Sequence, residues 1–347
     1  MRREALFYKL EGERKVRCHL CPHNCLISEG EVGICRVREN IDGKLYTLVY
    51  GKPIAQHVDP IEKKPLFHFQ PGSLSYSIAT IGCNLRCKHC QNWDISQAGR
   101  EYIEVMRVDV PPEEIVEKAS QAGCSSISYT YTEPTIFFEY AYETAKLSHK
   151  KGLRNVFVTN GYISKEALET IAPYLDAANV DLKAMSDEFY RKICGARLQP
   201  VLDSIKRYHE LGVWVEVTTL IIPGYNDKPE ELREIAEFIK SIDPEMPWHV
   251  TAFYPSYKLM DAPPTPVSTL REAVSIGKKV GLSYVYQGNV GEGEDTICPS
   301  CGEKLVVRDG FRVRRNIIEN GRCPSCGNSI PGVDMDGSLR SNNSIYI

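Results

Sequence analysis

From about residue 75 to residue 290, short β-branched or aromatic runs alternate with longer stretches of helical periodicity. This alternation is typical of repeated β-α units around a parallel sheet. Six or seven such units, with no GxGxxG motif after the first run, favour a partial (β/α)6 barrel of TIM type over a Rossmann sheet. The predicted strands cover residues 76–81, 126–131, 155–159, 178–181, 214–220 and 248–253, with a short one at 283–287.

The charge balance excludes some function classes. Lys and Arg number 42 and Asp and Glu 45 in 347 residues, which gives a formal net charge of −3. This balance makes no overall electrostatic case for nucleic acid or an anionic membrane as the main partner. The first residues lack the apolar core of a signal peptide, and no run of about 18 apolar residues occurs in the sequence. We therefore expect a cytoplasmic protein with no membrane association.

The 13 cysteines are the most informative part of the composition. Only Cys124 and Cys194 stand alone, and these predict small core or loop residues. Cytosolic thiols stay reduced, so clustered cysteines indicate metal ligands better than disulfides. The other eleven form three groups: Cys18, Cys21, Cys25 and Cys35; Cys83, Cys87 and Cys90; and Cys298, Cys301, Cys323 and Cys326.

The middle group follows the first predicted barrel strand, on the face where barrels carry their active sites. Three thiolates are too few for a closed zinc site. A [4Fe-4S] cluster on three cysteines instead keeps one iron open for another ligand. The alternative is a zinc loop that takes His89 as its fourth ligand. That alternative leaves the position at a strand end unexplained.

The spacing Cys83-x3-Cys87-x2-Cys90 resembles the radical S-adenosylmethionine (SAM) superfamily. The resemblance implies that the open iron chelates SAM and that one electron cleaves SAM to a 5′-deoxyadenosyl radical, which abstracts hydrogen from a substrate. It also implies an external reductase or flavodoxin-type electron donor. Cys83, Cys87 and Cys90 are then the catalytic cluster ligands.

The later predicted strands end in polar residues. The order of these residues is similar to that in the branch of the superfamily that contains the pyruvate formate-lyase activating enzymes. By that resemblance Glu133 contacts the SAM amino group, although Tyr131 and Thr132 replace the two glycines of the branch's Gly-Gly-Glu-Pro stretch. Purely structural interpretations are also possible: Asn160-Gly161 is a common turn sequence, and Asp181 with Lys183 is a possible salt bridge at a strand end. The remaining expected cofactor contacts are Thr159, Asn160, Asp181 and Lys183 for ribose and methionine carboxylate, and His89, which either stacks near adenine or faces solvent.

The two outer groups each supply four cysteines. Cys298, Cys301, Cys323 and Cys326 form two Cys-Pro-Ser-Cys pairs around a hairpin-like stretch, which predicts a zinc ribbon. For Cys18, Cys21, Cys25 and Cys35, a closed zinc site and an auxiliary iron–sulfur cluster are both chemically sound, and a structural metal is the preferred interpretation.

With the N-terminal cysteine set, the segments Gly51-Lys52-Pro53 and Asp59 to Leu66 and the late Tyr286-Gln287-Gly288-Asn289, the chain looks like the radical SAM component of the AmmeMemoRadiSam system. The resemblance implies Memo-like and AMMECR-like partner proteins and an unidentified substrate. The alternatives are an activating enzyme for a glycyl-radical enzyme and a non-catalytic metal-binding adaptor for RNA or protein. The predicted domains are 1–74, the barrel 75–290 and a tail 291–347.

Overall fold

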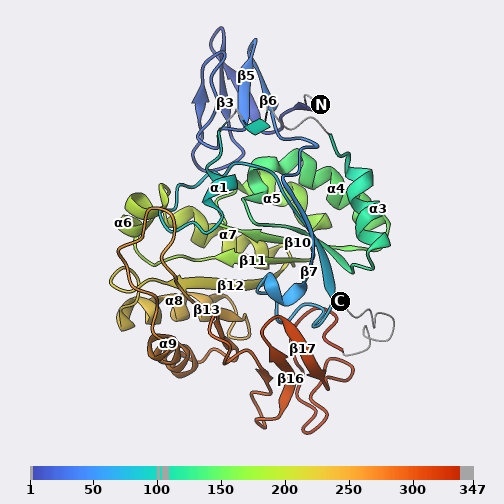
Figure 1. Cartoon of the computed structure of the whole chain (residues 1–347), viewed down its shortest axis with the longest axis vertical. Coiled ribbons are helices and arrows are strands. Elements are labelled where there is room, and N and C mark those ends of the chain that lie inside the picture. Colours follow the sequence, from blue (N-terminus) through green and yellow to red (C-terminus); the bar gives the residue numbers. More distant parts are fainter. Residues whose placement is uncertain (1–2, 100–101, 104–108, 337–347) are drawn as a thin grey trace.

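The computed structural model describes residues 3–99, 102–103 and 109–336. Within these residues the centre is one eight-stranded sheet in the order β14-β13-β12-β11-β10-β9-β8-β7 (Figure 1). The seven expected strands form, each within two residues of its predicted bounds, and they run parallel. They are β8 (Leu74–Ala79), β9 (Ser126–Tyr129), β10 (Arg154–Thr159), β11 (Ala177–Asp181), β12 (Trp214–Ile221), β13 (Trp248–Ala252) and β14 (Val285–Gly288).

One helix connects each pair of successive parallel strands and packs an apolar stripe on the sheet. In α8, for example, Leu232, Ile235, Ala236 and Ile239 are buried at helical spacing. Gly281 ends α9 in the left-handed conformation, at φ 111°. The helices are α3 (Pro112–Gln121), α4 (Phe138–Lys150), α5 (Lys165–Ile171), α7 (Gln199–Glu210), α8 (Pro229–Ile242) and α9 (Val267–Val280). The short elements are α1 (Trp93–Ser96), α6 (Asp187–Phe189), the 3₁₀ turns η1 (Ile61–Lys63), η2 (Pro134–Phe137) and η3 (Ala172–Tyr174), and a π-helix, η4 (Tyr190–Cys194).

The strand β7 (Ala55–Pro60) was not predicted. It pairs antiparallel with β8, from Ala55 opposite Ala79 to Pro60 opposite Leu74. Its sequence, Ala-Gln-His-Val-Asp-Pro, is too polar to stand out as a strand. β7 and β14 are the two edges of the sheet, so the barrel is open between them.

The segment 61–70 closes the foot of the barrel, at the amino ends of the parallel strands. Ile61, Leu66 and Phe69 are buried against residues near the start of three strands. The carboxylate of Glu216 accepts hydrogen bonds from the backbone N–H groups of Phe67 (3.0 Å) and His68 (2.7 Å). The segment is therefore part of the barrel interior and not a surface loop.

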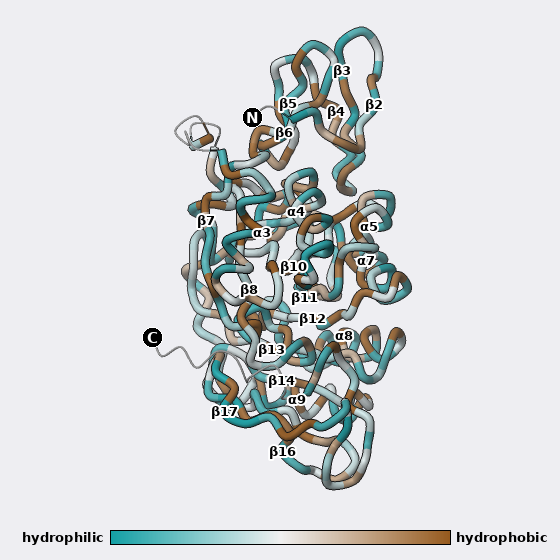
Figure 2. Tube along the Cα trace, turned by 90° about the vertical axis from the view of Figure 1, so that its right-hand side faces the viewer, coloured by the Kyte–Doolittle hydropathy of each residue, from teal (hydrophilic) through white to brown (hydrophobic). Residues whose placement is uncertain are grey.

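The N-terminal cysteine group lies in two small sheets at one end of the molecule (Figures 1 and 2). Small sheets of this size have little core of their own. The first has the order β2-β3-β4 and the second β1-β6-β5. Their strands are β1 (Arg3–Glu4), β2 (Tyr8–Glu11), β3 (Lys15–Cys18), β4 (Leu26–Ile27), β5 (Arg38–Ile41) and β6 (Lys44–Thr47).

The C-terminal group lies at the opposite end of the molecule, with β15 (Thr296–Ile297) and the hairpin of β16 (Lys304–Asp309) and β17 (Arg312–Asn316) (Figure 1). The expected hairpin therefore forms, and residues 337–347 of the predicted tail lie outside the described part. Arg308 joins this module to the barrel foot. Its guanidinium is fully buried, donates to the carbonyl of Phe67 at 2.8 Å and lies 3.7 Å from the carboxylate of Glu62.

In the described part of the chain, no helix combines the length and the apolar composition that a membrane crossing requires.

We expect Arg308→Met to weaken the attachment of the C-terminal module. The substitution leaves the buried Glu62 carboxylate and the Phe67 carbonyl without their partner, so the free energy of unfolding should fall by about 3–5 kcal/mol. Anaerobic chemical denaturation measures this change. Arg271→Met removes an exposed ion pair with Glu292 and serves as the control, with an expected loss under about 1 kcal/mol. Equal small losses in both variants would contradict the proposed attachment.

Candidate functional site

The three-cysteine loop leaves the barrel directly after β8. Gly82 has φ 97°, and a Cβ atom there would lie 2.7 Å from Val37 and 3.0 Å from the carbonyl oxygen of Cys35. Only glycine allows this close approach of the loop to the N-terminal module. The N–H of Leu85 donates to the sulfur of Cys83 at 3.3 Å, and Ser96 contacts the sulfur of Cys90 at 3.2 Å. Two of the three thiols thus have polar neighbours of the kind that tune iron–sulfur clusters.

Segments distant in the sequence hold this loop from several sides. Asn160, after β10, donates to the side-chain oxygen of Asn84 at 2.9 Å and to the sulfur of Cys83 at 3.6 Å. Ser256, after β13, donates to the carbonyl of Cys90 at 3.2 Å. His23 of the N-terminal module contacts the carbonyl of Asn84 at 2.7 Å. The carboxyl ends of the strands therefore meet around the three cysteines, as expected for a barrel mouth.

Glu133 is the centre of a buried hydrogen-bond network at this mouth. Its Oε1 accepts from the N–H (3.0 Å) and hydroxyl (2.6 Å) of Thr135 and from the hydroxyl of Thr159 (2.8 Å). Its Oε2 accepts from the N–H of Asn160 at 2.8 Å. Burial raises the pKa of Glu133, and these donors act against that rise. Oε1 is saturated, whereas Oε2 keeps capacity for another donor.

Tyr131 has the left-handed backbone conformation, with φ 63°. This conformation is costly for a bulky side chain, so it marks stored strain next to the network of Glu133. The Tyr131 hydroxyl donates to Asp59, and Lys64 also donates to Asp59 at 2.7 Å. The Lys64 ammonium lies 4.5 Å from the centre of the Tyr131 ring. The backbone at Tyr131 therefore has a conformation that glycine adopts readily, and polar contacts with Asp59 and Lys64 hold it.

Asp181 and Lys183 extend the mouth on the next strand. The Lys183 ammonium donates to the Asp181 carboxylate at 2.8 Å, and both lie within electrostatic range of Cys87. Interactions with Asp181 and Cys87 raise the pKa of Lys183 despite burial. His89 is 4% exposed, so the solvent-facing alternative is wrong. Burial lowers its pKa to about 3, which keeps the ring neutral.

The four N-terminal cysteines line one pocket. Leu20, Ile27, Ile34 and Ile136 make much of its wall apolar, and His23 and Arg38 also line it. Burial raises the pKa of Cys25 and raises that of Cys35 to about 11. Without a bound cation these groups are therefore thiols, which is typical of metal ligands that release protons on binding.

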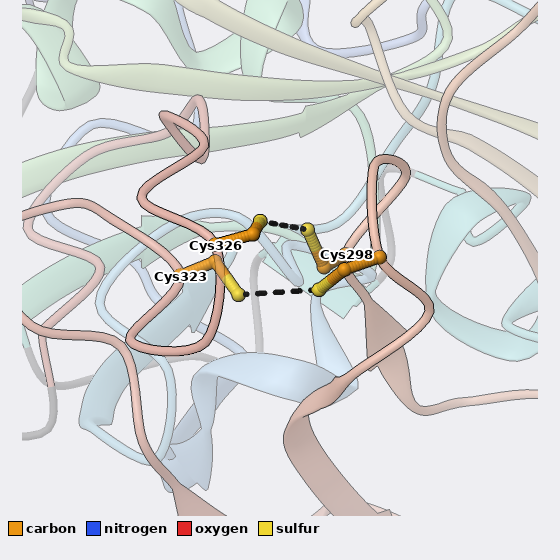
Figure 3. A group of neighbouring side chains, drawn as sticks. Cys298, Cys323 and Cys326 are labelled. Atoms are coloured by element: carbon orange, nitrogen blue, oxygen red, sulfur yellow. Dashed lines mark hydrogen bonds between the residues drawn. The ribbon is translucent and has the colours of Figure 1, made fainter.

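The four C-terminal cysteines are closer together. Their sulfur atoms all lie within 4.8 Å of one another, with 3.6 Å between Cys298 and Cys326 and 3.7 Å between Cys301 and Cys323. Figure 3 shows Cys298, Cys323 and Cys326 on two turns that face each other. Cys301 and Cys326 are exposed, so this group lies at the surface. Sulfur atoms at such separations form a closed candidate metal site.

Sequence reasoning missed Cys194 as part of the mouth. It is fully buried, as a core residue would be, yet its thiol hydrogen bonds to Cys87. A single cysteine has no spacing partner, and 107 positions separate the two residues in the chain. The sequence therefore carried no signal of this contact.

The comparisons with known proteins agree with this geometry. Residues 77–239 match the family model of the radical SAM superfamily. The chain is 49% identical over 333 residues to the Methanocaldococcus jannaschii protein named "Uncharacterized protein MJ0808", which covers 94% of this chain and 98% of that protein. It is 27% identical over 169 residues to the pyruvate formate-lyase-activating enzyme of Clostridium pasteurianum, which covers 46% of this chain and 67% of that enzyme.

The fold also has a counterpart among solved structures. The crystal structure of Streptococcus suis SuiB bound to S-adenosylmethionine superposes with a TM-score of 0.50 at 16% identity, over 66% of this chain and 53% of that one. At this identity the likeness concerns the fold alone. The family match over residues 77–239 and the homology to activating enzymes place the chain in the radical SAM superfamily and support a radical SAM enzyme, and this family implies a [4Fe-4S] cluster and SAM.

Proposed function

We propose that Cys83, Cys87 and Cys90 hold the cluster and that the enzyme uses it to cleave SAM reductively. When bound, the cluster would supply the one electron that splits the bond between sulfur and C5′ of SAM into methionine and a 5′-deoxyadenosyl radical, which would take a hydrogen atom from a substrate carbon. The observation that carries this proposal is a loop of three thiols, and not four, at the mouth of a partial barrel.

The polar strand ends supply contacts for SAM. Oε2 of Glu133 has a free acceptor position, and a carboxylate suits an ammonium group. Lys183 offers a cation for the methionine carboxylate, next to Asp181. Thr159 and Asn160 donate to Glu133 and orient it, and we assign these two residues to the ribose region by the family resemblance. The neutral, buried ring of His89 suits a flat base such as adenine.

Anaerobically reconstituted protein is expected to release 5′-deoxyadenosine when it is reduced in the presence of SAM. Cys87→Ala removes one of three iron ligands and should abolish this product. Liquid chromatography of the quenched reaction measures it. Cys124→Ala, at another buried free cysteine, is the matched control and should retain the activity. Failure of the wild-type protein under several reductants would contradict the proposal.

Glu133→Gln tests the SAM contact. The amide nitrogen cannot accept the hydrogen bonds that the carboxylate accepts, so we expect the Kd for SAM to rise by at least about tenfold, or ~1.4 kcal/mol. Iron content should stay unchanged. Calorimetric titration of the reconstituted protein measures the affinity. Glu188→Gln, on the exposed surface of α6, should bind SAM as the wild type does. An unchanged Kd in Glu133→Gln would exclude the assigned role.

The pathway proposal rests on the resemblance carried by the N-terminal cysteine set, by residues 51–53 and 59–66, and by residues 286–289 at the end of the barrel. We place the enzyme in an AmmeMemoRadiSam-type pathway in the cytoplasm, with Memo-like and AMMECR-like partner proteins and a flavodoxin-type or reductase electron donor. The substrate remains to be identified. The three cluster ligands lie next to polar side chains from several strand ends. A radical SAM enzyme needs these polar groups to bind SAM, whereas a non-catalytic metal-binding adaptor has no use for them.

A second candidate function is activation of a glycyl-radical enzyme. The names of relatives favour it, since the chain is also 22% identical over 221 residues to the pyruvate formate-lyase 1-activating enzyme of Escherichia coli K12, which covers 59% of this chain. In the same anaerobic assay, a glycyl-radical signal in the electron paramagnetic resonance (EPR) spectrum of an added glycyl-radical enzyme would support this candidate.

We propose single zinc ions for both outer cysteine groups. In the C-terminal group the sulfur separations of 3.6 and 3.7 Å approach the ~3.8 Å edge of a tetrahedron with bonds of about 2.3 Å. In the N-terminal group four thiolates also suffice to close a tetrahedron around one ion and leave no open position. The alternative is an auxiliary iron–sulfur cluster in the N-terminal group.

Elemental analysis of the reconstituted protein decides between these assignments. We expect about four irons and about two zincs per chain. Substituting Cys83, Cys87 and Cys90 together by Ala should remove the iron and leave the zinc. About eight irons with one zinc would show a cluster in the N-terminal group and contradict the zinc assignment there.

A further inference from the structure

A second buried thiol, outside the predicted ligand set, lies against the cluster loop. Cys194 is the last residue of the π-helix η4. The carbonyl groups of Ile193 and Cys194 accept hydrogen bonds from the N–H groups of Lys88 (2.9 Å) and Arg86 (2.7 Å). These two bonds lie on either side of Cys87 in the sequence. The end of η4 is therefore paired with the backbone that carries Cys87.

The local backbone of η4 is built for this contact. A π-helix is rare and marks functional positions more often than ordinary helix does. Gly195 follows with φ 71°, and a Cβ atom there would lie 3.3 Å from the Cβ of Arg86. The hydroxyl of Tyr190, the first residue of η4, accepts the N–H of Lys183 at 3.0 Å. The element thus contacts both the cluster loop and the strand end that carries Lys183.

The two thiols form a donor–acceptor pair. Their side chains are in hydrogen-bond contact. A sulfur that binds iron carries no proton, so in the loaded enzyme the Cys194 S–H would be the donor and the Cys87 sulfur the acceptor. Lys183 adds a positive charge within range of both sulfur atoms. Burial alone would disfavour negative charge on the Cys87 sulfur. The Cys194 thiol and the Lys183 ammonium both stabilise that charge.

The same contact excludes Cys194 as the fourth cluster ligand. A thiol in hydrogen-bond contact with Cys87 is too close to that sulfur to bind a different iron of the same cluster. Its partner in the structure is Cys87, not the open corner. The fourth position consequently remains available to SAM.

We propose that Cys194 is a positioning residue that donates a hydrogen bond to the iron-bound sulfur of Cys87 and so stabilises the reduced cluster. The reduced cluster carries one more negative charge than the oxidised cluster, and part of that charge lies on the cysteine sulfurs. Hydrogen bonds to cluster sulfurs favour the more negative state and raise the reduction potential. Cys194 thereby makes it easier for a low-potential one-electron donor to load the cluster. The inference rests on the cluster that the family implies and on no particular substrate.

An anaerobic redox titration followed by EPR tests this role on the reconstituted full chain. For Cys194→Ala we expect full iron content but a more negative midpoint potential. At a fixed donor potential the ratio of reduced to oxidised cluster should fall at least about threefold. Cys194→Ser keeps a donor and should titrate close to wild type. Cys124→Ala, also buried and free, controls for loss of a thiol elsewhere.

An unchanged midpoint potential in iron-replete Cys194→Ala would overturn the proposal. If Cys194→Ala does not bind iron, electron–nuclear double resonance of the reduced cluster decides instead.

The wild-type spectrum should show an exchangeable proton, and its signal should disappear in D₂O. In Cys194→Ser this proton should be present with an altered coupling. An identical spectrum of exchangeable protons in Cys194→Ser and wild type would likewise overturn it. Both readouts are independent of SAM cleavage, so they separate this inference from the proposed function.

Discussion

The attachment of the cluster loop to segments far away in the sequence is the interaction on which the mouth depends. A loop of this kind has polar backbone groups that must find partners. Here Ile193 and Cys194 accept two of its N–H groups, and Ser256 donates to one of its carbonyls. Asn160 joins the loop to the network of Glu133. Residues that follow three other strands thus set the position of the three thiols. One of them, Asn160, also donates to Glu133, so the cluster loop and an expected SAM contact belong to one hydrogen-bond network.

The parallel core could be predicted from the sequence because strands buried on both faces appear as apolar runs. β7 was missed for the opposite reason: its sequence includes the exposed His57 and the buried Asp59, which accepts a hydrogen bond from Lys64, so no apolar run marks the strand. The turn at Tyr131 was also invisible, since tyrosine gives no sign of a positive φ. The cysteine motif located the loop, but no pattern in one sequence connects Cys87 to a cysteine in a π-helix over a hundred residues later.

The outer modules brace opposite parts of the barrel. The N-terminal module contacts the mouth, where Gly82 permits the backbone of Cys35 to approach and Arg86 donates to the carbonyl of Ile34. The C-terminal module contacts the foot, where the bridge between Phe69 and Val333 and the buried Arg308 join it to segment 61–70. A metal bound in either group therefore stabilises the barrel as well as its own small sheet.

The buried bond between Arg308 and Phe67 joins residues 241 positions apart. Contacts between such distant parts of the chain form late, because a long loop must close before they contribute any stability. During synthesis the parallel strands and the cysteine loop emerge before Arg308 does. The foot of the barrel is thus completed after the mouth, and the iron ligands can meet while the other end of the barrel is still unfinished.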